Sequence, residues 1–476
     1  MKMIYDVEAK PPFKNLIVFA LQQMLAIITA TLLVPMIISN NAYGITMDPA
    51  AALFGAGAGT LVYIMFTKKK SPVFLGSSFA FIAPMSGAIA FGFWGIFVGA
   101  AIAGLVYVII ATIIHFIGTD WVNKLLPPVV IGPTVALIGL SLAGNAVSDL
   151  TKASGAGQAY NLVAILCGLV TFFVTIICSA KGNKTMKLIP FIIGIVSGYV
   201  VAAIFTGIGV AANCEYLKIV NFSALEANFT NIKFTSFFNY PEFSFLIKGG
   251  NKFDLHALGN VFLLYAPVAF VVLAEHIADH KNISAIIERD LIKDPGLKRT
   301  LLGDGVGSIV GAFFGGCPNT TYGESIGCVA ITKNASVASI IWAAILCMVL
   351  AFFTPFVAFV NTIPSCVLGG ICVALYGFIA VSGLNMLNKI DLSESKNLFV
   401  VSSILVAGIG GLSLKFGNPN NPIITITSIA TALILGIIVN LILKDKHSTS
   451  KGSVEEVVAT SKETGDEMVE EPPKEN

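Results

Sequence analysis

Long apolar runs, separated by short polar stretches, fill most of this chain. The full-length runs fall near residues 16–38, 50–67, 93–117, 127–147, 160–180, 187–211, 258–279, 300–315, 336–361, 364–384, 396–414 and 422–443. Two shorter runs, at 73–90 and 317–331, are interrupted by polar residues. A helix needs about 20 apolar residues to cross a bilayer. The pattern therefore predicts an all-α polytopic membrane protein with fourteen transmembrane segments, the interrupted pair included.

The composition agrees with a membrane protein. Of the 476 residues, 55% are hydrophobic and 12% are charged, whereas soluble domains carry roughly 25% charged residues. The lipid bilayer is thus the expected surrounding, and no room is left for a large soluble domain. A net charge of +2 gives no indication of nucleic-acid binding.

The eight cysteines are expected to be small buried apolar residues rather than metal ligands or disulfide partners. The sequence contains no Cys-x-x-Cys pair, and most cysteines lie within apolar runs. They are Cys167, Cys178, Cys214, Cys317, Cys328, Cys347, Cys366 and Cys372. Neither a metal site nor a cofactor site is predicted.

Basic residues follow every second apolar run, which predicts the orientation of the segments. Lysine and arginine accumulate in cytoplasmic loops, and here they precede the first segment and follow the even-numbered ones. We therefore expect a multi-pass protein of the cytoplasmic membrane, with both termini in the cytoplasm and the long loop 213–257 outside. Residues 444–476, rich in Glu, Lys, Ser and Thr, are expected to form a disordered cytoplasmic tail.

The two halves of the chain resemble each other. Residues 135–139 read VALIG, and residues 373–377, half a chain length later, read VALYG. The two interrupted runs are also about half a chain apart. Seven segments in each half is an odd number, so the halves must have opposite orientations. Inverted repeats with paired broken segments place a substrate at the interface between the repeats.

Each interrupted run combines an extended stretch with a helix start. In the first run the helix start follows Ser77 and Ser78, either of which is a candidate N-cap. In the second run, two threonines precede Gly323 and Glu324. The free N–H groups of a helix start are donors toward an anion or a carbonyl group. We expect the extended pieces to pair as a short antiparallel two-stranded sheet; short loops or re-entrant surface segments are the alternative.

Two carboxylates lie where a charge is costly. Glu275 and Glu324 are in or beside apolar runs, and a charge at bilayer depth costs ~2.5 kcal/mol or more, so such residues usually face a polar pathway. Asp279 shares a helical face with Glu275, and His276 shares the adjacent face with His280. Glu275, Glu324, His276 and Asp279 are candidates for proton coupling. The alternatives are buried hydrogen-bonding roles for Glu275 and His276, and a solvated helix end for Asp279 and His280.

These groups suit a planar neutral ring that carries both N–H donors and carbonyl acceptors, such as uracil. The carboxylates would accept hydrogen bonds from the ring N–H groups, and backbone N–H groups near Phe79 and Gly323 would donate to its carbonyls. Phe79, Tyr322 or Tyr376 would cover the ring face. Because burial and a neighbouring carboxylate favour the protonated form of a carboxyl group, one acid is a candidate to take up a proton with the substrate.

Motifs for other mechanisms are missing from the sequence. It contains no P-loop, no H-E-x-x-H and no G-x-S-x-G pattern, so ATP-driven transport and membrane proteolysis are not indicated. An intramembrane enzyme would need a nucleophile next to a base, and no such pair is evident. We therefore expect no enzymatic activity.

Several motifs resemble those of the nucleobase–ascorbate transporter family (nucleobase:cation symporter-2), and within it the bacterial uracil permeases. The matching segments are residues 21–24 (LQQM), 74–81 (FLGSSFAF), 274–276 (AEH), 294–297 (DPGL) and 318–324 (PNTTYGE) with its continuation to Lys333. The last of these is the most specific. The resemblance extends from about residue 11 to residue 443.

The resemblance implies a proton-coupled symporter that imports uracil by alternating access. The residues implied to lie at the base are Glu275, Glu324, Phe79, Gly323, Tyr322 and Tyr376. It also implies a core domain of residues 16–117 and 258–361 and a gate domain of residues 118–257 and 362–443, after a cytoplasmic N-terminal segment, 1–15. A homodimer is left open.

Three residues depart from the family pattern. Ser325 stands where the signature has Asn, Asp279 where some uracil permeases have a His, and Gln23 where a His is common in the first segment.

One alternative function is a xanthine- or urate-type purine symporter of the same family. Another is an anion exchanger of the same fold, against which two glutamates in the site argue.

Overall fold

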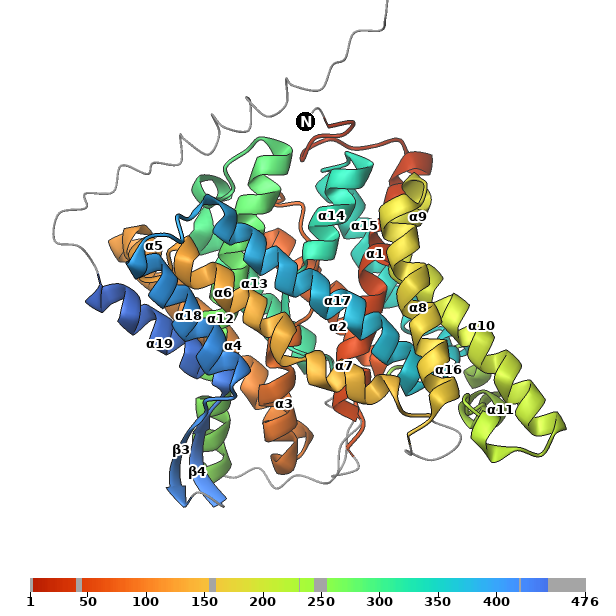
Figure 1. The fold of residues 1–476 in the computed structure, drawn as a ribbon. Helices are drawn as coiled ribbons and strands as arrows, with labels where there is room; N and C mark the ends of the chain where they lie inside the picture. Colours follow the sequence, from red (N-terminus) through yellow and green to blue (C-terminus); the bar gives the residue numbers. More distant parts are fainter. Residues whose placement is uncertain are drawn as a thin grey trace, which may run out of the picture.

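The computed structural model describes residues 3–39, 45–153, 160–230, 232–243, 255–418 and 421–443. The chain is mostly helical and contains two short two-stranded sheets (Figure 1). The expected tail, 444–476, lies outside the described residues, as does part of the loop 213–257.

The first half of the chain forms helices interrupted once by a strand. Its elements are α1 (Phe13–Ser39), α2 (Pro49–Phe66), β1 (Leu75–Ser77), the 3₁₀ helix η1 (Phe79–Phe81), α3 (Ile82–Ala88), η2 (Ile89–Phe91), α4 (Phe93–Ile117), α5 (Asp120–Leu125), α6 (Pro128–Ser141), α7 (Ala143–Leu150), α8 (Leu162–Lys181), α9 (Lys184–Leu188), α10 (Pro190–Ala211), η3 (Glu215–Leu217), α11 (Ser223–Phe229) and η4 (Phe234–Ser236).

The second half repeats the interruption and adds a hairpin near its end. Its elements are α12 (Leu255–Ile287), η6 (Ile292–Gly296), α13 (Leu297–Phe313), β2 (Asn319–Thr321), α14 (Gly323–Thr332), α15 (Val337–Leu350), α16 (Thr354–Val360), α17 (Ser365–Asn385), η7 (Met386–Lys389), α18 (Ser395–Ile409), β3 (Leu414–Asn418), β4 (Asn421–Ile426) and α19 (Ser428–Ile442).

Many of these helices are long and apolar enough to cross a membrane. Eight in the described part of the chain meet both conditions: α1, α2, α4, α6 continued by α7, α8, α10, α12 and α17. Helices α15, α18 and α19 are apolar but shorter. The run at 336–361, expected to be one segment, is two helices, because α15 ends at Leu350 and α16 begins at Thr354. Hydropathy alone does not mark that break.

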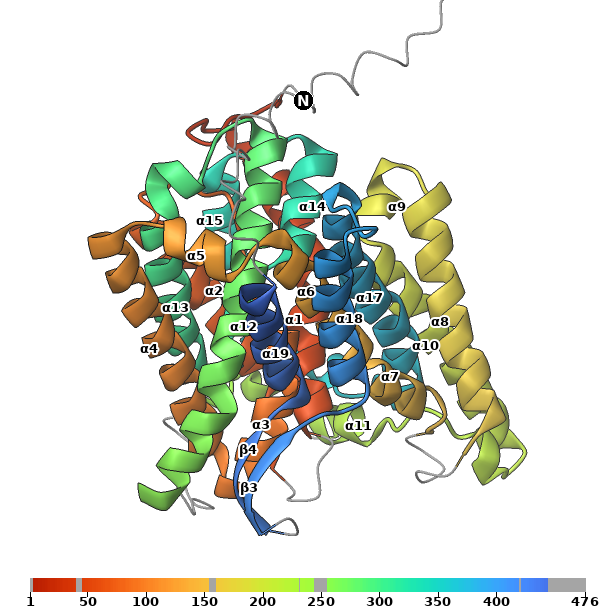
Figure 2. The ribbon, with the colours of Figure 1, turned by 60° about the vertical axis from the view of Figure 1, so that its left-hand side comes forward.

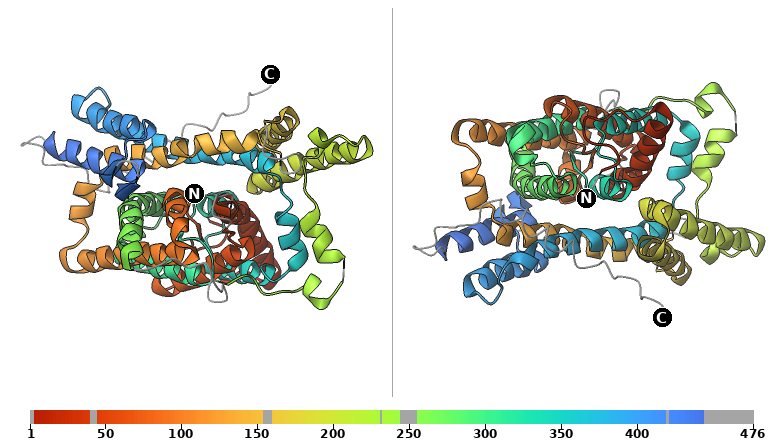
Figure 3. Two further views of the ribbon diagram at one scale, coloured as in Figure 1. Left: turned by 90° about the horizontal axis from the view of Figure 1, so that it is seen from below. Right: turned by 90° about the horizontal axis from the view of Figure 1, so that it is seen from above.

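The helices form two groups that face each other (Figure 3). The first group contains α1–α4 and α12–α15, with α13 packed against both α2 and α4. The second group contains α6–α10 and α17–α19, with α17 packed against α6, α7 and α8. The chain passes between the groups through α5, through the segment that contains α11 and η4, and through α16. Helix α12 of the first group contacts α6 and α19 of the second.

The two copies of the repeated motif lie on neighbouring helices. Residues 135–139 are on α6 and residues 373–377 are on α17, and these helices pack closely. A Cβ atom on Gly139 would lie 2.3 Å from the Tyr376 carbonyl oxygen, and one on Gly383 would lie 2.2 Å from the Ala136 nitrogen. Glycine on each helix therefore lets the backbone of the other approach.

The interrupted segments pair as expected. Strand β1 runs antiparallel to β2, with Leu75 opposite Thr321 and Ser77 opposite Asn319, and both strands are buried. Gly76, in the middle of β1, lies against the ring of Tyr322. A Cβ atom on Gly76 would be 2.3 Å from a ring carbon of Tyr322. The predicted antiparallel pair is confirmed.

A second hairpin was not predicted. Strands β3 and β4 pair antiparallel between α18 and α19, and they lie beside the lower end of α12 in Figure 2. The sequence carries a turn signal there, because residues 417–422 read GNPNNP between two runs with strand-forming residues. Seven of the eight cysteines are buried, as expected for small apolar residues; Cys214 is partly exposed.

Helices α8 and α10 are in close contact because small residues face one another. A Cβ atom on Gly198 would lie 1.8 Å from Thr171 Oγ1, and one on Gly194 would lie 1.9 Å from Thr175 Oγ1. The opposite face of α10 exposes Val196, Val200, Ile204 and Ile208. Lipid does not drive helices together as water does, so close packing of small residues is the main source of their association.

We expect Gly198→Ala to destabilise the protein by about 1–3 kcal/mol, because the added methyl group has to displace Thr171. Thermal unfolding of the detergent-solubilised protein measures this change. Gly207→Ala on the same helix is the control, since a Cβ atom there meets nothing within 4 Å. Equal unfolding temperatures for the two variants would contradict the packing argument.

Candidate functional site

Most of the predicted site residues line one small cavity between the two helix groups. Its volume is about 60 Å³. The first group contributes Phe79, Glu275, Ala278, Asp279, Tyr322, Gly323 and Glu324, together with Thr320 and Thr321 on β2. The second group contributes Val135 on α6, Phe378, Ile379 and Ser382 on α17, and Met386 on η7. Both groups are therefore needed to form the cavity.

Three carboxyl groups line this cavity. Glu275 and Asp279 lie one turn apart on α12, and Glu324 is in the first turn of α14. The Thr321 hydroxyl on β2 donates a hydrogen bond of 2.7 Å to Asp279 Oδ2. No lysine, arginine or histidine is among the residues that line the cavity. The prediction that Glu275 and Asp279 share a face is confirmed.

Helix α14 begins at the cavity wall. Tyr322 precedes the helix with an extended backbone (φ −110°, ψ 124°) and provides no side-chain cap. The first helical acceptor is the Tyr322 carbonyl, which receives the Ile326 N–H group at 3.2 Å. The N–H groups of the first turn therefore have no partner within the helix. A Cβ atom on Gly323 would meet nothing within 4 Å, so the space beside this turn is open.

The start of η1 differs from expectation. Ser78 does occupy the N-cap position, but its hydroxyl makes no capping hydrogen bond, and the element is a short 3₁₀ helix. The Ser78 N–H group donates instead to the Pro318 carbonyl at 2.9 Å, which extends the β1–β2 pairing by one residue. The serine position was predicted correctly, but the prediction of a side-chain cap was wrong.

The aromatic candidates have different surroundings. The Tyr322 hydroxyl donates to the Ser77 carbonyl at 2.7 Å, so its ring is held across the two strands. Tyr376 is buried on α17 and contacts the Phe79 ring edge to face, with 5.7 Å between centroids. Phe79 and Tyr376 therefore form an aromatic contact between the two helix groups beside the cavity.

His276 points away from the cavity into a buried polar cluster with α13. Its Nδ1 lies 2.7 Å from Asp304 Oδ2 and its Nε2 lies 3.0 Å from Thr300 Oγ1. Because the Thr300 hydroxyl donates to the Leu297 carbonyl at 3.0 Å, Nε2–H of His276 is the donor to Thr300. One proton is then shared between Nδ1 and Asp304. Both His276 and Asp304 are fully buried.

His280 continues this polar cluster. Its Nδ1–H donates to the His276 carbonyl at 2.8 Å, and its Nε2 is 2.7 Å from the Tyr63 hydroxyl, which also contacts Ser71. The two imidazole rings stack with centroids 4.1 Å apart. His280 is fully buried, so its interpretation as part of a solvated helix end was wrong.

Sequence reasoning missed the partners of these histidines and the cavity residues of the second group. Asp304 is a carboxylate in the apolar run 300–315, which is the same signal that identified Glu275. Phe378, Ile379, Ser382 and Met386 are spaced along one face of α17 and its continuation. No local feature of the sequence marks that face as the one that meets the first group.

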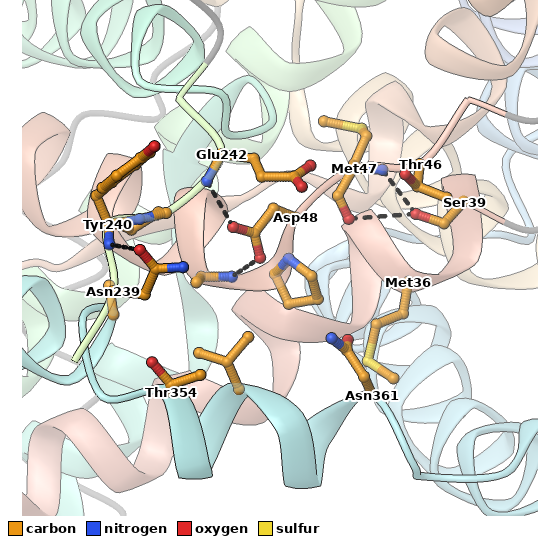
Figure 4. Close-up of a pocket in the computed structure, with 15 residues that line it drawn as sticks. Met36, Ser39, Thr46, Met47, Asp48, Asn239, Tyr240, Glu242, Thr354 and Asn361 are labelled. Carbon is orange, nitrogen blue, oxygen red and sulfur yellow. Dashed lines mark hydrogen bonds between the residues drawn. The ribbon is translucent and has the colours of Figure 1, made fainter. Parts of the chain in front are cut away.

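A larger cavity, of about 540 Å³, lies elsewhere (Figure 4). It lies where α1 ends and α2 begins, next to residues 239–242 and α16. In it Asp48 accepts hydrogen bonds from the backbone N–H groups of Ala50 at 2.9 Å and Glu242 at 2.8 Å. None of the predicted site residues lines it. The smaller, acid-lined cavity is therefore the candidate site.

A helical membrane protein whose two broken segments meet at an acid-lined cavity between two helix groups has the architecture of a membrane transporter. The Permease family matches residues 14–416. The chain belongs to this family.

Its curated relatives are permeases. It is 38% identical to a uracil permease of Bacillus caldolyticus over 96% of this chain and 98% of that protein. It is 38% identical to a uracil permease of Bacillus subtilis over 89% of this chain and 92% of that protein. It is also 32% identical to a uracil permease of Escherichia coli K12 over 92% and 93% of the two chains. The chain thus has transporters, not enzymes, as its relatives.

Solved structures with the same fold are more distant in sequence. The transmembrane domain of a cyanobacterial bicarbonate transporter aligns with a TM-score of 0.58 at 14% identity, covering 92% of this chain and 100% of that one. The murine anion transporter Slc26a9 in the inward-facing state aligns with a TM-score of 0.62 at 10% identity, covering 92% and 69% of the two chains. At these identities the likeness concerns the fold alone.

We expect Asp304→Ala to lower the free energy of unfolding by at least about 1–3 kcal/mol, because it leaves His276 Nδ1 buried without a partner. Thermal unfolding in detergent measures the loss. Asp120→Asn, at an exposed position in α5, is the control and should change stability by less than about 1 kcal/mol. An Asp304→Ala variant as stable as this control would show that the cluster does not hold α12 to α13.

Proposed function

We propose that this protein imports uracil across the cytoplasmic membrane together with protons, by movement of the first helix group against the second. The observation that carries the proposal is the cavity itself, where three carboxyl groups and the first turn of α14 meet between the two helix groups. The uracil permeases that resemble this chain over nearly their full length support the choice of substrate.

The donors and acceptors around the cavity match those of a uracil ring. Glu275 and Glu324 accept hydrogen bonds from the two ring N–H groups. Backbone N–H groups at Gly323 and Phe79 donate to the ring carbonyls, and Phe79 with Tyr376 covers one ring face. Each donor on the ring thus has a carboxylate partner, and each acceptor has a backbone partner.

The size of the cavity supports a moving site. At about 60 Å³ it is well below the roughly 300–1,000 Å³ of ordinary ligand pockets. Its walls come from both helix groups, so a shift of one group against the other changes its volume and its access. We identify the first group with a core domain that carries the substrate and the second with a gate domain that stays in place.

The charge of the cavity supports coupling to protons. Uracil is neutral and brings no positive charge to three carboxyl groups that have no basic residue among the cavity lining. Like charges held this close in a medium of low dielectric constant favour protonation of at least one member. Protons taken up with the substrate are then the simplest compensating charge.

The paired interruptions and the neighbouring motif copies support two inverted repeats of seven segments each. Strands β1 and β2 come from corresponding places in the two halves, as do α6 and α17. With the basic loops on the inner side, this arrangement puts both chain termini in the cytoplasm.

An anion exchanger of the same fold is disfavoured, because an acid-lined cavity repels an anionic substrate.

We expect Glu275→Gln and Glu324→Gln each to reduce uracil uptake by about 10- to 100-fold, since a hydrogen bond to a charged group contributes roughly 1.5–3 kcal/mol. Radiolabelled uracil uptake into proteoliposomes measures the loss, with the amount of inserted protein determined in parallel. Glu226→Gln, at an exposed position in α11, is the control and should transport normally. Near-normal uptake by either cavity variant would remove that residue from the site.

The choice of substrate is tested by competition in the wild-type protein. Transport that is blocked by excess xanthine but not by excess uracil would overturn the choice of uracil.

We expect an inside-alkaline pH gradient to drive uracil accumulation and a sodium gradient alone to drive none. Each coupled proton supports about tenfold accumulation per pH unit at zero membrane potential, because one pH unit corresponds to 1.36 kcal/mol. The measurement is uracil uptake into proteoliposomes with the potential clamped and each gradient imposed separately. Accumulation driven by sodium at equal pH would refute proton coupling.

A further inference from the structure

Three phenylalanine rings lie exposed where the chain crosses between the two helix groups. Phe234 is in η4, Phe238 follows it, and Phe353 directly precedes α16; their exposed fractions are 78%, 49% and 37%. Phe238 contacts both of the other rings, with centroids 5.8 Å from Phe234 and 5.9 Å from Phe353. The three rings thus form one surface, which we call the aromatic patch. An exposed apolar patch on a folded protein usually marks a surface that meets a partner.

The aromatic patch covers two linkers that are hydrogen-bonded to each other. One linker, with α11 and η4, leads from α10 to α12, and the other, with α16, leads from α15 to α17. The Asn239 N–H group donates to the Phe352 carbonyl at 3.1 Å, and the Thr354 N–H group donates to the Phe237 carbonyl at 3.0 Å. The Thr354 hydroxyl also donates to the Thr235 carbonyl at 3.1 Å. These two crossings between the helix groups therefore form one unit.

The surface beside this unit faces lipid. Helix α10, which leads into the first linker, is long and apolar enough to cross a membrane. It exposes Val200, Ile204 and Ile208 along one face, and Val210 in its last turn is 65% exposed. Helices α11 and α16 contact each other at the edge of the molecule where they bridge the two groups (Figure 3). The aromatic patch is therefore at the periphery, next to the end of a lipid-facing helix.

Two constraints set the depth of the aromatic patch in a bilayer. Apolar rings in contact with water are unfavourable in proportion to their exposed area, which argues against a fully aqueous loop. The backbone that carries Phe234 and Phe238 is a single 3₁₀ turn followed by irregular chain, and irregular backbone facing lipid is not tolerated in the hydrocarbon region. Lys233, next to Phe234, is exposed, and lysines near helix ends reach toward the headgroups. Only the interface between headgroups and acyl chains satisfies both constraints.

We propose that the aromatic patch binds the interface region of the lipid bilayer and anchors the two joined linkers at the membrane surface. Segments that lie in this region bury their apolar side chains at the boundary between headgroups and acyl chains. A second copy of this chain is the other occupant to consider. Three partly exposed rings, each of about 150–250 Å², offer less than the roughly 800 Å² per partner of a stable protein interface. The anchor gives the chain a fixed depth at which it crosses between the helix groups.

The test places an environment-sensitive fluorophore, NBD, on single cysteines of the full-length protein in lipid vesicles. Cys214, which is partly exposed, is first changed to serine; the other seven cysteines are buried. Phe234→Cys reports on the aromatic patch and Val200→Cys on the lipid-facing side of α10. Lys293→Cys reports on water, because this side chain, in the loop between α12 and α13, is 75% exposed. The vesicles contain phosphatidylcholine brominated either near the headgroup or at the chain end.

We expect lipid brominated near the headgroup to quench the label at position 234 at least twofold, and more strongly than lipid brominated at the chain end. The opposite order is expected at position 200, in the middle of α10, and no quenching by either lipid at position 293. Phe238→Cys repeats the measurement within the aromatic patch, so that a folding defect in one variant does not decide the outcome.

Three results would overturn the proposal. Quenching of the label at position 234 by aqueous iodide but by neither lipid would place the linkers in water. Stronger quenching by the chain-end bromines would place them in the hydrocarbon region. Protection from both lipids and iodide, together with dimers formed by a bismaleimide between the cysteines of two subunits, would make a second copy of this chain the occupant. None of these readings requires transport activity, so the proposal stands or falls separately from the proposed function.

Discussion

The rest of the site depends on one constraint: three carboxyl groups line a single cavity, and no basic residue is among the residues that line it. Glu275 and Asp279 come from α12 and Glu324 comes from α14, and α12 packs against both α14 and β2. In a medium of low dielectric constant such charges are tolerated only with hydrogen-bond donors or compensating charge. The Thr321 hydroxyl supplies one donor to Asp279. The other hydrogen-bond acceptors of these carboxyl groups are available to a molecule bound in the cavity.

A second layer of polar groups, behind the cavity, holds these acids in place. Asp304 and Thr300 bind both nitrogens of His276, the neighbour of Glu275. On the other side Gln23 and the Phe74 backbone bind Ser325, the neighbour of Glu324. Each cavity glutamate is thus followed in the chain by a residue that is hydrogen-bonded away from the cavity. Because adjacent side chains point in different directions, one turn of helix can place a carboxylate in the cavity and also hydrogen-bond to a neighbouring element.

The sequence was sufficient to locate the acids and the broken segments. A carboxylate in an apolar run, and a serine or threonine stretch where a helix should continue, are local signals with a clear physical cost. They correctly predicted the shared face of Glu275 and Asp279 and the antiparallel pairing of the two interrupted segments. The resemblance to a transporter family agreed with the comparisons over nearly the whole chain.

Features that depend on distant parts of the chain could not be predicted in this way. The contacts of His276 with Asp304 and of Gln23 with Ser325 join different helices, and no spacing within one helix reveals them. The break between α15 and α16 falls in a continuous apolar run, where hydropathy measures length but not the point at which a helix ends. The face of α17 that meets the cavity is apolar on several sides, so periodicity did not distinguish it.

The strand pair has a consequence for how the protein is made. Ser77 and Tyr322, which are hydrogen-bonded across it, are 245 positions apart, so β1 leaves the ribosome long before its partner exists. During that interval its unpaired backbone groups are a liability in lipid, where each lacks an alternative partner. The first half of the chain therefore has to be protected by its own helices or by the insertion machinery until β2 is made, and the acid-lined cavity is completed only when the second half has been inserted.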